Sequence, residues 1–133
     1  YTQSIQDMST ISGNPLVTLE KISTSVNGRG IFLYNIAREG SASIKKETIV
    51  AMALQHPGED AGGYFIEGYT NFLLDQANSE KLLDTYNFLV IHVMNPDGLS
   101  EGNTRYNSKM EDLNNIWIAR FYNRFYNLIY IFF

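Results

Sequence analysis

A histidine and a glutamate three positions apart are the side chains best suited to chemistry in this chain. They are His56 and Glu59, in the sequence His-Pro-Gly-Glu. A neutral imidazole nitrogen and a carboxylate oxygen both bind zinc, and a catalytic zinc takes three protein ligands and keeps one position for water. The pair therefore supplies two ligands of such a site, and a third must come from elsewhere.

The elements around this pair predict a crossover of two parallel strands. An apolar run over 48–54 precedes His56 and reads as a buried strand, and a second run over 88–94 reads as a central one. Between them, apolar side chains spaced by three and four over 64–74 predict an amphipathic helix, and 80–86 a short helical stretch. Strand, helix and strand of this length predict a right-handed parallel pair. Its carboxyl ends are where open α/β sheets place their sites.

The amino-terminal part predicts a hairpin. Runs over 16–22 and 30–36 read as strands, and Asn27-Gly28 between them is a turn signal. The fold class is therefore α/β, with a mixed sheet that has central parallel strands and an amino-terminal antiparallel hairpin. We expect residues 1–15 to be loop or leader, 16–117 to form a partial domain, and 118–133 to be an aromatic tail.

The tail has two interpretations. Aromatic and aliphatic residues recur at helical spacing from Ile118 to Phe132, which predicts an amphipathic helix that covers exposed sheet or binds a membrane surface. Alternatively, the tail is truncated or out-of-frame sequence with no folded role. The stretch is too short and too charged for a membrane span.

Composition excludes several classes of function. A hydrophobic fraction of 44% is that of a globular chain. The absence of cysteine excludes disulfides and thiolate metal sites, and a formal net charge of −4 gives no basic surface for nucleic acid. No membrane-length apolar run is present. The sequence does not encode an oligomeric state.

Four motifs occur in a fixed order along the chain. They are His56-Pro57-Gly58-Glu59, Asn95-Pro96-Asp97-Gly98, Gly102-Asn103-Thr104-Arg105 and Asp112-Leu113-Asn114. This series resembles the zinc carboxypeptidase family, most closely its cytosolic-carboxypeptidase branch and bacterial relatives, over 26–117. Lys45-Lys46 and Gly28-Arg29-Gly30 also fit that branch.

The resemblance implies a hydrolase of the metalloprotease class that removes carboxy-terminal residues from peptides or proteins by zinc-activated water. It implies that His56 and Glu59 bind zinc, with a histidine far downstream as the third ligand. It implies that Arg105 has the catalytic role of polarising the scissile carbonyl and stabilising the oxyanion. It also implies that Asn114 binds the terminal carboxylate of the substrate. The branch also suggests acidic tails as substrates and favours a cytoplasmic location.

Two departures from the family pattern keep other functions open. Asn115 stands where the family has an arginine that pairs with the substrate carboxylate, and an amide lacks that charged fork. The family's third ligand and catalytic glutamate lie beyond Asp-Leu-Asn, and this chain stops at Phe133. The remaining histidine, His92, sits in an apolar run and is expected to be structural.

Three functions follow from these observations. The first is the carboxypeptidase, the second is a zinc amidohydrolase or deacylase of the same superfamily, and the third is a non-catalytic remnant or binding module. Arg105 as an ordinary surface arginine and Asn114 as a cap or turn residue are the plainer alternatives for those two side chains.

Overall fold

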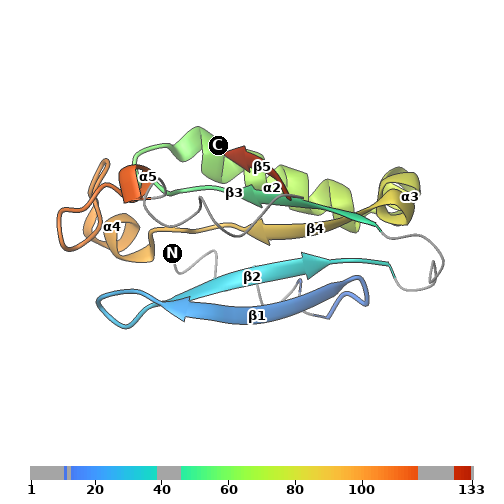
Figure 1. Cartoon of the computed structure of the whole chain (residues 1–133), viewed down its shortest axis with the longest axis horizontal. Coiled ribbons are helices and arrows are strands. Elements are labelled where there is room, and N and C mark those ends of the chain that lie inside the picture. Colours follow the sequence, from blue (N-terminus) through green and yellow to red (C-terminus); the bar gives the residue numbers. More distant parts are fainter. Residues whose placement is uncertain (1–10, 12, 39–45, 117–127, 133) are drawn as a thin grey trace.

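A five-stranded mixed sheet organises the described part of the chain, in the order β1-β2-β4-β3-β5 (Figure 1). The structure is a computed structural model and describes residues 11, 13–38, 46–116 and 128–132. The strands are β1 (Val17–Thr24), β2 (Gly30–Ile36), β3 (Glu47–Met52), β4 (Tyr86–Ile91) and β5 (Leu128–Phe132). The helices are α2 (Asp60–Leu74), α3 (Gln76–Thr85), α4 (Pro96–Glu101) and α5 (Leu113–Ile116).

The predicted hairpin is confirmed. β1 and β2 pair antiparallel, from Val17 opposite Ile36 to Thr24 opposite Gly30. The turn between them closes with Ser25 N–H donating to the Arg29 carbonyl over 2.8 Å. Gly28 has φ +83° in this turn, a conformation that glycine adopts without steric cost.

The predicted parallel crossover is also confirmed. β3 and β4 pair in parallel from Glu47 opposite Tyr86 to Met52 opposite Ile91. The connecting helices bury Ile66, Leu73 and Leu83 in one core with side chains of β2, β3 and β4. Figure 1 shows α2 running along the sheet beside β3 and α3 at the end where β4 begins. The mixed α/β class expected from the sequence is therefore correct.

Several predicted boundaries are wrong, and for α3 the reason is local. The helix predicted over 80–86 begins at Gln76, because the Asp75 carboxylate accepts a hydrogen bond from Ala77 N–H and caps it. β4 begins at Tyr86 and ends at Ile91, earlier than the predicted 88–94. β3 ends at Met52 rather than at residue 54.

The Asn95-Pro96-Asp97-Gly98 motif, whose residue types are common in turns, is the start of a helix. The Asn95 side-chain oxygen accepts a hydrogen bond from Gly98 N–H over 3.0 Å, and Pro96 occupies the first helical position of α4. Proline fits there because the first N–H groups of a helix have no partner within it. The same residues that signal a turn therefore cap α4.

The tail contributes an edge strand. β5 pairs in parallel with β3, from Thr48 opposite Leu128 to Met52 opposite Phe132. The helical interpretation of the tail is therefore wrong for Leu128–Phe132, where a run of aliphatic and aromatic residues suits a strand. The rest of the tail, 117–127 and 133, and most of the predicted loop or leader, 1–10 and 12, lie outside the described residues. None of the helices in the described ranges is long and apolar enough to span a bilayer.

Candidate metal and substrate site

The end of β3 places His56 at the carboxyl edge of the parallel strands. Beyond the strand, the Ala53 and Leu54 carbonyls accept hydrogen bonds from Met94 N–H and Asn95 N–H, both at 3.0 Å. Leu54 has φ +53°, a left-handed conformation that is unusual for leucine, and it turns the chain into the His-Pro-Gly-Glu segment. The segment therefore lies beside the amino end of α4.

Two glycines let a later loop approach this segment closely. Gly58 N–H donates to the Thr104 carbonyl over 2.9 Å, and a Cβ at Gly58 would meet that same oxygen at 2.9 Å. A Cβ at Gly98 would meet the Tyr106 carbonyl at 2.5 Å. Real Cβ atoms do not approach a carbonyl this closely, so larger residues would push the loop away. The two glycines thereby bring Arg105 and its neighbours to His56.

The two predicted zinc ligands, His56 and Glu59, contact each other. His56 Nδ1 lies 2.9 Å from Glu59 Oε1, with the imidazole nearly buried and the Glu59 side chain 53% exposed. An imidazole nitrogen and a carboxylate oxygen are both atoms that zinc binds, so His56 Nδ1 and Glu59 Oε1 are the atoms that would hold the ion.

Asp112 holds the other nitrogen of the His56 ring. His56 Nε2 lies 2.9 Å from Asp112 Oδ1, and the Asp112 side chain is 9% exposed. A carboxylate on the far ring nitrogen of a metal-binding histidine fixes its tautomer and orientation, and leaves the near nitrogen for the metal. The sequence motif Asp112-Leu113-Asn114 contains this aspartate but predicts no role for it. Its position two residues before Asn114 was the only signal.

Four donors converge on the Asp112 carboxylate. They are His56 Nε2 and Asn114 N–H at one oxygen, and Arg105 Nε and Asn115 Nδ2 at the other. The His56 hydrogen bond is the largest cause that lowers the pKa of Asp112 to about 2, and Arg105 and the Asn114 backbone add to it. Asp112 is therefore ionised at neutral pH.

The pKa of His56 itself is raised. Burial is the largest single influence and lowers the pKa, but hydrogen bonds to Glu59 and Asp112 outweigh it. Two carboxylates therefore favour a positive charge between them, which is the charge that a bound cation would also supply. The electrostatics of the pair suit a cation.

Arg105 and Asn114 take different positions around Asp112. Arg105 donates through Nε over 2.8 Å, and its side chain is 49% exposed. Asn114 is exposed, and it donates to Asp112 through its backbone N–H, over 3.0 Å. The structure thus brings the sequence-predicted residues His56, Glu59 and Arg105 into one network. It places Asn114 beside that network at the start of α5.

His92 lies in a separate environment, as expected for a structural histidine. Its Nε2 is 2.7 Å from Thr70 Oγ1, and its ring stacks on Tyr34 with centroids 4.5 Å apart. Within the described ranges, no group of three or more histidine, cysteine, aspartate or glutamate side chains could hold a metal ion. Among the described residues, the site therefore has two candidate zinc ligands, His56 and Glu59.

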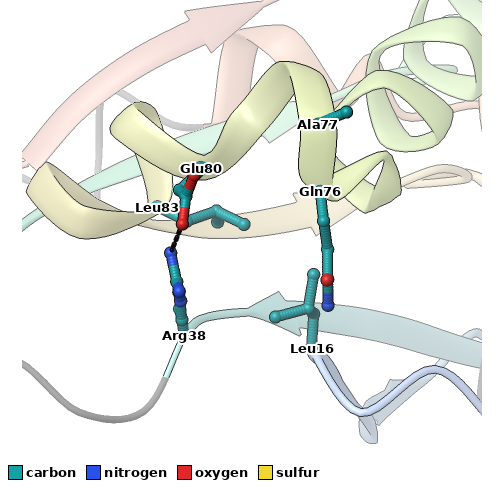
Figure 2. Close-up of a pocket in the computed structure, with 6 residues that line it drawn as sticks. All are labelled: Leu16, Arg38, Gln76, Ala77, Glu80 and Leu83. Atoms are coloured by element: carbon teal, nitrogen blue, oxygen red, sulfur yellow. Dashed lines mark hydrogen bonds and ion pairs between the residues drawn. The ribbon is translucent and has the colours of Figure 1, made fainter.

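A pocket of about 230 Å³ (Figure 2) lies beside α3, at the end of the sheet opposite α4 and α5 (Figure 1). It opens between the end of β2 and α3, where Arg38 and Glu80 form an ion pair at 2.8 Å. Its lining residues are Leu16, Arg38, Gln76, Ala77, Glu80 and Leu83. None of them is a predicted site residue, so this pocket is distinct from the His56 network.

Comparison with known proteins identifies the family. The family model described as zinc carboxypeptidase matches residues 2–125, so the chain belongs to the zinc carboxypeptidase family. The cytosolic carboxypeptidase 2 of Xenopus tropicalis is 35% identical over 100 residues, which are 72% of this chain and 10% of that protein. The match extends on both sides of the 26–117 span that carries the motifs.

Solved structures show the same fold. A metallo-carboxypeptidase from Burkholderia cenocepacia aligns with a TM-score of 0.82 and 28% identity over 89% of this chain and 32% of that one. A metallo-carboxypeptidase from Pseudomonas aeruginosa, in complex with (2-guanidinoethylmercapto)succinic acid, aligns with a TM-score of 0.77 and 30% identity over 89% of this chain and 31% of that one. The chain therefore spans about a third of the length of these proteins. The family assignment and carboxypeptidase-like fold expected from the sequence are confirmed.

Proposed function

We propose that this chain carries part of the active site of a zinc metallocarboxypeptidase, which hydrolyses carboxy-terminal residues from peptides or proteins. The observation that supports it most is the arrangement at His56, whose Nδ1 meets Glu59 while its Nε2 is held by Asp112. This is the arrangement of a metal-binding histidine with its supporting carboxylate. Family membership supports zinc as the metal.

Each residue of the network has a distinct task in this proposal. His56 Nδ1 and the Glu59 carboxylate hold the zinc, and Asp112 fixes the imidazole. Zinc, when bound, supplies a water of lowered pKa and polarises the scissile carbonyl. The Arg105 guanidinium provides fixed positive charge near the reacting group, which stabilises an oxyanion. The Asn114 amide is a hydrogen-bond donor for a carboxylate.

The third ligand required by a catalytic zinc is not among the described residues. We propose that another segment of a longer protein supplies it, because the solved relatives are about three times as long as the matched region. By likeness to the cytosolic carboxypeptidases, we further propose a peptide or protein carboxyl terminus as the substrate and the cytoplasm as the location.

The test is zinc binding measured together with hydrolysis. The purified chain should hold zinc, and His56→Ala and Glu59→Gln should each weaken that binding strongly, since each removes one of the two ligands. Glu67→Gln, on the exposed side of α2, is the matched control and should leave zinc binding unchanged. In the longer protein that supplies the third ligand, hydrolysis should require a free carboxyl terminus, so an amidated peptide should not be cleaved. Zinc affinity that is the same in His56→Ala would contradict the assignment.

A non-catalytic binding module is the second candidate, and the count of ligands favours it. Two ligand side chains bind zinc more weakly than three, and they do not enclose it. This reading predicts a folded chain with weak zinc binding and no turnover at any zinc concentration. Turnover that disappears with a chelator and returns with zinc would exclude it.

A further inference from the structure

The pocket beside α3 lies between the open end of the β1–β2 hairpin and one face of that helix (Figure 2). At the hairpin, the Leu16 carbonyl accepts a hydrogen bond over 3.0 Å from the N–H of the residue before Arg38. On the helix, Gln76, Glu80 and Leu83 are spaced by four and three residues, so they share a face. Two segments far apart in the sequence therefore form the walls of the pocket.

A lysine ties these two walls together. Lys46 Nζ donates to the Arg38 carbonyl over 2.9 Å and to the Leu83 carbonyl over 2.6 Å. These hydrogen bonds join the chain after β2 to the second half of α3, and they use backbone atoms rather than the side chains of the lining. The pocket is therefore formed by the fold before any ligand arrives, as is usual for small-molecule sites.

Charges of both signs meet at one side of the pocket. Arg38 Nη1 lies 2.8 Å from Glu80 Oε1 and 3.4 Å from Asp84 Oδ1. Both contacts use Nη1, so within the described part of the chain the other two nitrogens of this guanidinium have no acceptor. The three side chains are between 43% and 61% exposed, and exposed ion pairs contribute little to stability. Rearranging them around a ligand therefore costs little.

The rest of the lining is mostly apolar. Figure 2 shows the Arg38–Glu80 pair at one side of the pocket and Gln76 above Leu16 at the other. Leu16 and Leu83 are 8% and 1% exposed, and Gln76 adds an uncharged amide. The volume of about 230 Å³ is below the roughly 300–1,000 Å³ of sites that hold drug-sized ligands. The pocket therefore suits a smaller molecule with one apolar part and charges at one end.

We propose that this pocket binds a free α-amino acid with an aliphatic side chain. The ligand's carboxylate accepts hydrogen bonds from the Arg38 guanidinium, and its ammonium group donates to Glu80 and Asp84. Its side chain lies against Leu16 and Leu83. A simple carboxylic acid would match only the guanidinium, and a simple amine only the two carboxylates, whereas a zwitterion matches both.

This site goes beyond the proposed hydrolysis and does not depend on zinc. The pocket lies at the end of the sheet opposite α4, and His56 lies beside α4 (Figure 1). None of the residues in its lining belongs to the Asp112 network. The two sites can therefore be tested separately.

The experiment is an NMR titration of the isotope-labelled chain, with EDTA present to keep zinc out. The ligands are L-leucine, acetyl-leucine, which lacks the ammonium group, and leucinamide, which lacks the carboxylate. We expect L-leucine to bind with a Kd on the order of 1 mM, since so small a ligand makes few contacts. It should shift the amide signals of Ala77, Glu80 and Leu83. Each analogue loses one charged contact and should bind about tenfold more weakly.

Three variants test the two parts of the pocket. Arg38→Gln removes the cation and should abolish the preference for L-leucine over leucinamide. Ala77→Leu keeps every charge but fills the apolar part of the pocket, so it should weaken L-leucine binding about tenfold. Lys81→Gln removes one exposed charge from the same helix and is the matched control, which should bind L-leucine as the native chain does.

The outcomes locate the ligand and identify its chemistry. Shifts that gather around His56 and Asp112 instead of α3 would overturn the proposal, because the ligand would then occupy the candidate zinc site. Equal binding of L-leucine and either analogue would overturn the match to a zwitterion. Unchanged binding in Ala77→Leu would overturn the assignment to this pocket. Since no zinc is present, failure here leaves the proposed function standing, and failure of the proposed function leaves this result unaffected.

Discussion

Two aspartates, Asp97 and Asp112, each collect four hydrogen bonds and serve different purposes. Asp97 is 1% exposed and accepts from Ser25 Oγ, Asn27 N–H, Arg29 Nη1 and Ser108 Oγ. Its donors join the β1–β2 turn, α4 and the following loop. Asp112 accepts from His56, Arg105 and their neighbours at the site.

The comparison shows how one kind of cluster can serve stability or positioning. The Asp97 carboxylate has no access to a ligand, because it is enclosed by the elements that it joins. Two of the donors of Asp112 reach more exposed groups: His56 Nδ1 meets the Glu59 side chain, which is 53% exposed, and the Arg105 side chain is 49% exposed. We therefore expect changes at Asp97 to act on unfolding, and changes at Asp112 to act on ligands.

The largest effect is expected at Asp97. Asp97→Asn keeps the shape of the side chain but leaves Arg29 and three neutral donors facing an amide, so the free energy of unfolding should fall by about 3 kcal/mol. Urea denaturation followed by circular dichroism measures this. A loss below about 1 kcal/mol would place Asp97 with ordinary surface pairs and break the comparison.

At Asp112 the effect should appear in zinc binding instead. Asp112→Asn removes the acceptor that fixes the His56 tautomer, and zinc affinity should fall about 10- to 100-fold. Competition against a colorimetric chelator measures the affinity, and urea denaturation of the same variant provides the contrast. Should Asp112→Asn unfold as readily as Asp97→Asn, the division between positioning and stability would fail.

The pH dependence of stability tests the role of Asp97 further. Burial raises the pKa of Asp97, but hydrogen bonds from Asn27 N–H, Arg29 and Ser25 outweigh it, and the net pKa is lowered. The pKa of Asp97 is therefore lower in the folded chain than in the unfolded chain, where it is about 3.9. The ionised carboxylate stabilises the fold fully above that unfolded pKa, and this stabilisation is lost as the pH falls through the folded pKa. The native advantage over Asp97→Asn should therefore shrink below about pH 4, by at most about 1.4 kcal/mol per pH unit. Denaturation at pH 7, 4 and 3 measures it, and a gap that stays constant would contradict this origin.

The smallest effect is expected from a matched pair of glycines. Gly58→Ala places a Cβ 2.9 Å from the Thr104 carbonyl, and should destabilise the chain by about 1 kcal/mol while weakening zinc binding. Gly68→Ala, on α2 with nothing within 4 Å of its Cβ, should stabilise by up to about 1 kcal/mol. Thermal unfolding of both variants measures the difference. Equal shifts in melting temperature would show that the loop does not constrain Gly58.

The sequence predicted the elements whose signals are local. The hairpin strand over 30–36 has its predicted limits, and the parallel pairing of β3 with β4 follows from apolar runs separated by a helix. The sequence missed the start of α3 and the helical character of Asn95-Pro96-Asp97-Gly98, because caps and turns use the same residue types. It also missed β5, whose apolar residues fit both a helix and a strand until β3 provides a partner.

For this protein, the sequence alone determined the family and the identity of the candidate ligands, because the four motifs keep their residue types and order. Only the tertiary structure decided that Asp112 supports His56, that Arg105 donates to Asp112 through Nε, and that the Asn115 amide faces the network. The physical reason is distance along the chain. His56 and Asp112 are 56 positions apart, and nothing local to either residue specifies a contact that two glycines and a loop must create.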